Sequence, residues 1–138
     1  MHENSDYKTR DKLKKKLGKR AEKLAIKHIK SKGFKVITRN FETEHGEIDF
    51  IAKKDDMIVF AEVRSRIAPS FMDPAESVNE TKRKKIALTA RDFILGLHIQ
   101  NKFLRFDVFA ILFDEKMKLI ELRHIENAFS HKILENFT

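Results

Sequence analysis

Residues 46–64 read GEIDFIAKKDDMIVFAEVR, two strand-like runs joined by a polar turn at Lys54-Asp55-Asp56. Ile, Val and Phe are typical of strands, and a short polar segment between two such runs predicts a β-hairpin. Antiparallel pairing that is symmetric about this turn places Asp49 directly opposite Glu62. The hairpin therefore predicts two facing carboxylates near the open end of the two strands.

Facing carboxylates on one face of a hairpin need compensation. Directly opposed residues have Cβ atoms about 4.5 to 5.5 Å apart, and like charges there are destabilising. The same register places Arg64 opposite Glu47 at the next position, so a surface ion cluster is one interpretation. The other is a hard divalent cation held by Asp49 and Glu62. The apolar side chains should then face a core on the other side: Ile48, Phe50, Ala52, Val59, Ala61 and Val63.

The rest of the chain supplies helices and further strands around this hairpin. Apolar residues at spacings of three and four predict two amphipathic helices. Strand-rich runs and the Asp114-Glu115-Lys116 turn predict a second hairpin. Asp73-Pro74 is typical of a helix start, and the tail could close with a short helix. The predicted elements are helices over about 12–32 and 80–97 and strands over about 34–41, 47–53, 57–66, 103–113 and 118–123.

Length and composition limit the class of protein. The 138 residues contain 41% hydrophobic and 36% charged side chains, which predicts a single folded domain over residues 1–138, with a basic N-terminal arm at about 1–11. The order of the predicted elements, a helix, three strands, a helix and two strands, predicts an α/β class with a mixed central sheet. The absence of cysteine excludes disulfides, thiol nucleophiles and Cys-based zinc sites. No apolar run could span a bilayer and the start lacks a signal-like apolar stretch, so we expect a soluble, cytoplasmic protein without a membrane partner.

Positive charge is concentrated at one end of the chain. The net charge is +8, but residues 8–35 carry 13 Lys and Arg against Asp11 and Glu22 only. A region of one sign is typical of a nucleic-acid contact, because neutralised phosphates release counterions. A solvated helix is the alternative. The candidate nucleic-acid-binding residues are Lys15, Lys16, Lys19, Arg20, Lys23, Lys82, Lys84 and Lys85.

Glu22 is the only acid between Lys12 and Phe41 and lies next to the apolar stripe of the basic helix. There it could reach inward toward the hairpin and assist the two carboxylates. Alternatively, it pairs with a neighbouring lysine and has no further role.

Taken together, these segments resemble the bacterial YraN family of small endonuclease-like proteins, which are similar to archaeal Holliday junction resolvases. The resemblance implies a restriction-endonuclease-like αβββαβ core in which Asp49 and Glu62 are the two acids of the PD-(D/E)XK signature and bind Mg²⁺ or Mn²⁺. Glu22 would be the helix-borne acid. The segments that carry it are residues 18–22, 33–34, 39–40, 46–52, 60–66, 74, 78, 82, 105–108 and 124–129.

Three positions depart from the family pattern. Ile48 stands where the signature has proline, and Ala21 replaces a glycine. Arg64 occupies the position of the signature lysine. A lysine can lose its proton and act as a base, whereas an arginine keeps its proton. Arg64 could still neutralise charge on a scissile phosphate, or Lys82 could supply the ammonium from the second helix.

We therefore expect a metal-dependent endonuclease acting on DNA rather than RNA, with catalytic residues Glu22, Asp49, Glu62, Arg64 and Lys82. Two alternatives stay open: a nucleic-acid-binding module of the same fold that does not cleave, and a scaffold whose basic helix docks an acidic partner. A homodimer is compatible with the sequence. His28 and His45 have no partner at metal-ligand spacing, and Arg105 with Asp107 predicts a structural ion pair.

Overall fold

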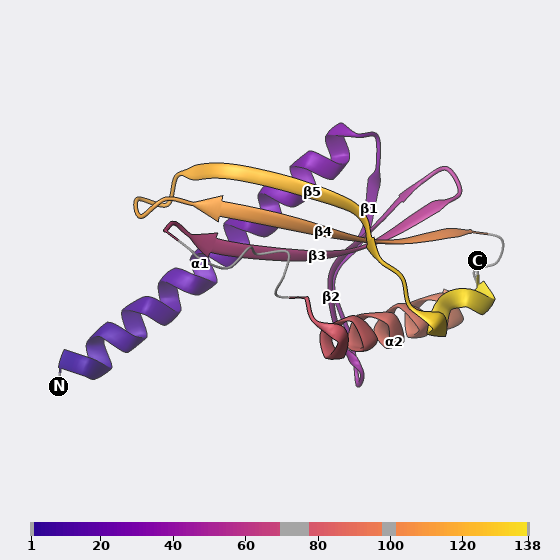
Figure 1. The fold of residues 1–138 in the computed structure, drawn as a ribbon, viewed down its shortest axis with the longest axis horizontal. Helices are drawn as coiled ribbons and strands as arrows, with labels where there is room; N and C mark the ends of the chain where they lie inside the picture. Colours follow the sequence, from indigo (N-terminus) through magenta and orange to yellow (C-terminus); the bar gives the residue numbers. More distant parts are fainter. Residues whose placement is uncertain (1, 70–77, 98–101, 138) are drawn as a thin grey trace.

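The computed structural model describes residues 2–69, 78–97 and 102–137 (Figure 1). These described residues form two long helices, five strands and a C-terminal 3₁₀ helix. In chain order the elements are α1 (His2–Ser31), β1 (Lys35–Thr43), β2 (Gly46–Lys54), β3 (Met57–Ile67), α2 (Glu80–Leu97), β4 (Phe103–Phe113), β5 (Leu119–Phe129) and η2 (Lys132–Phe137). The helix expected to start at Asp73-Pro74 lies outside the described residues.

The five strands form one mixed sheet in the order β1-β2-β3-β4-β5. All neighbours are antiparallel except β3 and β4, which are parallel. A parallel pair needs a long crossover, and α2 provides it. The predicted α/β class with a mixed central sheet, and its αβββαβ element order, are confirmed.

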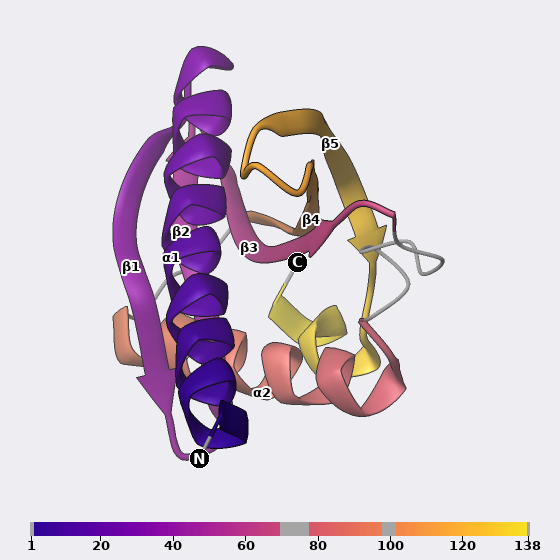
Figure 2. The ribbon, with the colours of Figure 1, turned by 90° about the vertical axis from the view of Figure 1, so that its left-hand side faces the viewer.

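Both faces of the sheet carry a core. On one face α1 packs against Phe50, Ala61 and Phe109, and on the other α2 packs against Ile51 and Phe60. Figure 2 shows α1 lying along β1 and β2, with α2 crossing below. The prediction that the hairpin has a single apolar face was wrong, since Ile48 belongs to the core under α2. Strands covered by helices on both faces bury side chains in both directions.

The helix α1 is longer than the sequence indicates. It begins at His2, so the residues expected as an N-terminal arm form its first turns. The side chains from Tyr7 to Lys12 are exposed, and without a buried stripe no periodicity announces this part of the helix. At the other end, Gly33 with a φ of 91° provides the expected stop.

Among the described residues, no helix is long and apolar enough to cross a membrane.

Candidate metal and phosphate site

The site begins where β2 and β3 separate. The predicted register of the hairpin is confirmed: the paired residues run from Lys54 and Met57 to Phe50 and Ala61, where the ladder ends. Asp49 is the next residue of β2, and its Oδ2 accepts a hydrogen bond of 2.7 Å from the backbone N–H of Val63. The carboxylate of Asp49 thus satisfies a strand N–H beyond the end of the ladder, which fixes it beside β3.

Glu62, on β3, is buried with 5% of its surface exposed. Two cations from different elements approach the same carboxylate oxygen. Arg64 Nε from β3 and Lys82 Nζ from α2 each lie 3.6 Å from Glu62 Oε1. The crossover that makes β3 and β4 parallel therefore also brings Lys82 to the strand acids, 20 residues along the chain from Glu62.

The two carboxylates resist simultaneous ionisation. Burial raises the pKa of Glu62 to about 7, and the charge of Asp49 adds to this, against the opposing charges of Lys82 and Arg64. Burial also raises the pKa of Asp49, although the Val63 N–H, the same two cations and a hydrogen bond from Glu62 oppose the shift. A proton shared by a buried acid pair is the expected consequence.

Replacing that proton with a cation suits this donor set. Buried carboxylate oxygens are the ligands that Mg²⁺ prefers, and one or two of them together with waters and phosphate oxygens complete its coordination. Within residues 2–69, 78–97 and 102–137, no group of three or more His, Asp or Glu side chains is placed to hold an ion unaided. The residues fit a metal that binds together with water and substrate.

Glu22 on α1 lies near enough to Asp49 for the two charges to interact. Burial raises its pKa, the charges of Asp49 and Glu47 raise it further, and Arg39 lowers it. Burial likewise raises the pKa of Glu47, with Asp49 as the next cause. The sequence singled out Glu22, whereas Arg39 entered only within the resembling segment 39–40 and without a role, because its proximity to Glu22 depends on how α1 lies along β1.

The candidate nucleic-acid-binding cations lie on the two helices. Lys16, Lys19 and Lys23 on α1 are exposed, and Lys15 lies 3.6 Å from Asp11. Lys84 and Lys85 are exposed on α2 beside the half-buried Lys82. The structure thus separates these residues into two groups on opposite faces of the sheet.

Arg20 is the exception among the α1 cations. Its guanidinium donates a hydrogen bond to the carbonyl of Met117 and lies over the Phe113 ring. Arg20 therefore joins α1 to the β4–β5 turn.

A second charged cluster lies on the α1 face. Arg105 donates two hydrogen bonds of 2.8 Å to Asp107, which confirms the predicted ion pair, and His124 Nε2 lies 2.7 Å from the same carboxylate. Burial would raise the pKa of Asp107, but His124, Arg105 and the Asn127 N–H hold it below its ordinary value. Lys32 completes the cluster by contacting His124 and Glu126. The charged side chains of this cluster contact one another, which indicates that the cluster has a structural role.

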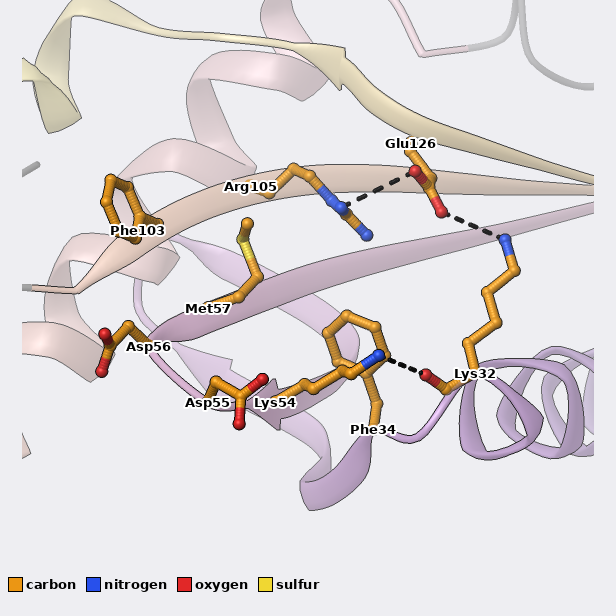
Figure 3. A pocket seen from close by; sticks show the side chains of 9 residues that line it. All are labelled: Lys32, Phe34, Lys54, Asp55, Asp56, Met57, Phe103, Arg105 and Glu126. Atoms are coloured by element: carbon orange, nitrogen blue, oxygen red, sulfur yellow. Dashed lines mark hydrogen bonds and ion pairs between the residues drawn. The ribbon is translucent and has the colours of Figure 1, made fainter.

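An open pocket of about 680 Å³ adjoins this cluster (Figure 3). Three cations in its lining are already engaged: Lys32 and Arg105 with Glu126, and Lys54 with the carbonyl of Lys32. None of the residues that line this pocket belongs to the Asp49–Glu62 site, so the pocket is distinct from that site.

The two histidines discounted from the sequence have structural partners. His28 makes edge contacts with the rings of Phe109 and His124. His45 Nδ1 lies 2.8 Å from Asp92 Oδ2, which joins the β1–β2 turn to α2.

We expect Glu62→Gln to stabilise the protein above neutral pH. Because the folded pKa of about 7 exceeds the ordinary 4.5, the folded state binds the Glu62 proton more tightly than the unfolded state. Wild-type stability should fall as the pH rises through this interval, and the variant should gain on the order of 1 to 3 kcal/mol at about pH 8. Urea unfolding across pH measures this, with Glu44→Gln at an exposed position as control. Equal pH dependence of Glu62→Gln and wild type would contradict the assignment.

The sequence matches a family and many relatives. Residues 21–111 match the Uncharacterised protein family UPF0102. A UPF0102 protein of Thermodesulfovibrio yellowstonii is 45% identical over 113 residues, covering 82% of this chain and 95% of that protein. A UPF0102 protein of Clostridioides difficile is 43% identical, covering 78% of this chain and 91% of that protein. A UPF0102 protein of Sulfurihydrogenibium sp. is 41% identical, covering 82% of this chain and 93% of that protein. The matched span includes Glu22, Asp49, Glu62 and Lys82.

Proposed function

The chain belongs to the UPF0102 (YraN) family, and from this premise we propose that it is a cytoplasmic, Mg²⁺- or Mn²⁺-dependent nuclease acting on DNA phosphodiesters. The observation that carries the proposal is the pair of the partly buried Asp49 and the buried Glu62 beside two cations, each 3.6 Å from Glu62. Two acids that resist joint ionisation favour a divalent cation, and nearby cations favour a phosphate. Phosphodiester hydrolysis uses both features.

In this proposal each residue has one task. Asp49 and Glu62 would hold the ion, which when bound would neutralise phosphate charge and activate a water for attack on phosphorus, while the bond from phosphorus to the leaving deoxyribose oxygen breaks and that oxygen takes up a proton from solvent. Glu22 accepts a hydrogen bond from the attacking water and orients it from α1. Lys82 or Arg64 stabilises the negative charge that develops on the scissile phosphate.

The two cations differ in what they can do. Arg64 keeps its proton and can act only as a fixed charge, whereas a lysine can also exchange a proton. Lys82 lies as close to Glu62 as Arg64 does. Its position supports Lys82 as the residue that fulfils the role of the signature lysine.

A non-cleaving DNA-binding module is the second candidate, and the presence of Arg64 at the signature position favours it. The unmodified protein should be tested with labelled duplex, flap, junction and single-stranded DNA in Mg²⁺ and in Mn²⁺. Slow metal-dependent cleavage supports the nuclease. Binding without cleavage of any of these DNAs would make the binding module the better account.

Charge reversal on α1 should weaken DNA binding. We expect Lys15→Glu, Lys16→Glu, Lys19→Glu and Arg20→Glu together to lower affinity and to flatten its steep dependence on salt, because fewer counterions are released. Filter retention across salt concentrations measures both. Since Arg20 also contacts Met117, the triple variant that retains Arg20 separates lost binding from lost folding. If no DNA or RNA binds the wild type at low ionic strength, the nucleic-acid interpretation is wrong.

A further inference from the structure

The N-terminal end of α1 stands clear of the folded body. Leu17, Ala21 and Ile29 pack α1 onto the sheet, and among the side chains described from Tyr7 onward Leu13 is the first that is partly buried. Every side chain from Tyr7 to Lys12 is exposed. Figure 1 shows this end of α1 extending beyond the strands. Residues 2–12 thus form a rod of about 16 Å at about 1.5 Å per residue.

Positive charge in this part of α1 is concentrated in residues 7–16, because residues 2–6 contain Glu3 and Asp6 and neither Lys nor Arg. Residues 7–16 include six cations and a single acid, Asp11, which lies 3.6 Å from Lys15. At roughly 100° per residue the cations form two rows about 160° apart around the helix axis. One row is Lys8, Lys12, Lys15 and Lys16, and the other is Arg10 and Lys14. Positive charge therefore flanks the helix on both sides.

We propose that the projecting end of α1 lies in the major groove of duplex DNA. This rests on the proposed function, which makes DNA the partner. An α-helix with side chains is about 10 to 12 Å across and the major groove of B-DNA is about 12 Å wide, so the rod fits. Two rows of cations on opposite sides of the helix face the phosphates of the two strands that border the groove. The narrow major groove of duplex RNA excludes a helix.

The length of α1 limits how far the proposed groove contact can lie from the Asp49–Glu62 site. Ala21 packs in the same core cluster as Phe50, the residue that follows Asp49, and Lys8 precedes Glu22 by 14 residues. A straight helix spans about 21 Å over that interval, which corresponds to at most about 6 base pairs at about 3.4 Å each. The groove contact should thus fall within about 6 base pairs of the phosphate at the site, so very short duplexes should lose it.

The test combines one variant, one control and two lengths of DNA. The variant combines Lys8→Gln, Arg10→Gln and Lys12→Gln, at three exposed positions in the projecting turns of α1. The control removes three exposed charges away from this end, at Lys27, Lys30 and Lys53. Circular dichroism verifies that both retain helix. Affinity is measured for DNA hairpins with stems of about 4 and about 16 base pairs, and for an RNA hairpin with the longer stem.

We expect the variant to lose on the order of a hundredfold in affinity at about 0.1 M salt on the longer DNA stem only, while the control loses less. Guanine N7, which faces the major groove, should be protected from methylation within about 6 base pairs of the bound phosphate by the wild type and not by the variant. Equal losses on both stems, an equal loss on RNA, or no loss would overturn the proposal. So would a loss seen instead with an acidic peptide or with anionic vesicles.

The two proposals fail separately. Metal-dependent cleavage that is indifferent to stem length and to the three substitutions overturns only the groove contact. A stem-length effect with no cleavage of any DNA overturns only the nuclease.

Discussion

Replacing Asp49 with asparagine should abolish metal-dependent DNA cleavage. The amide oxygen of asparagine can still accept the Val63 N–H, 2.7 Å away in the wild type, so the fold is retained while the charge that holds the ion is lost. Even the loss of an outer-shell partner of a metal ligand typically costs 10- to 100-fold, so removal of a ligand charge should cost at least about a hundredfold. Cleavage of labelled DNA in Mg²⁺ and Mn²⁺ measures the loss.

Asp55→Asn is the matched control, because Asp55 lies exposed at the tip of the same hairpin. DNA binding by Asp49→Asn should equal or exceed that of the wild type, since one negative charge has been removed from the phosphate site. Cleavage by Asp49→Asn at the wild-type rate would contradict the assignment of the metal site.

The second large effect concerns the cation that stabilises the transition state. If Lys82 has this role, Lys82→Ala should lower the cleavage rate on the order of a hundredfold or more and leave DNA binding nearly intact. Arg64→Ala should then be tolerated. If Arg64 suffices as a fixed charge, Arg64→Ala should instead lower the cleavage rate and Lys82→Ala should be tolerated. Single-turnover cleavage with saturating protein measures the chemical step, and Lys85→Ala, one turn along α2, controls for general loss of charge.

Much of the fold can be predicted from the sequence because its periodicities are strong. The α2 helix has the predicted bounds, and so does β4. The register of the first hairpin follows from its polar turn, which is why the sequence could predict that Asp49 lies opposite Glu62. The first turns of α1 could not be predicted because their exposed side chains carry no apolar periodicity, and the core on both faces of the sheet could not because it depends on tertiary packing.

The details of the site show the same division. That Asp49 satisfies the N–H of Val63 depends on where β2 and β3 separate, which no local pattern reports. The approach of His124 to Asp107 depends on a register shift between Phe106 and Val108 where β4 pairs with β5. Lys82 was a candidate from the family resemblance and from its charge, and only the crossover of α2 shows how near it lies to Glu62.

The most direct test of the central claim is a soak of crystals of the full chain in Mn²⁺, followed by anomalous diffraction. The account predicts an anomalous peak between the carboxylates of Asp49 and Glu62, and no such peak in crystals of Asp49→Asn. Anomalous peaks that occur only elsewhere, or the absence of any between these two carboxylates at saturating Mn²⁺, would contradict it.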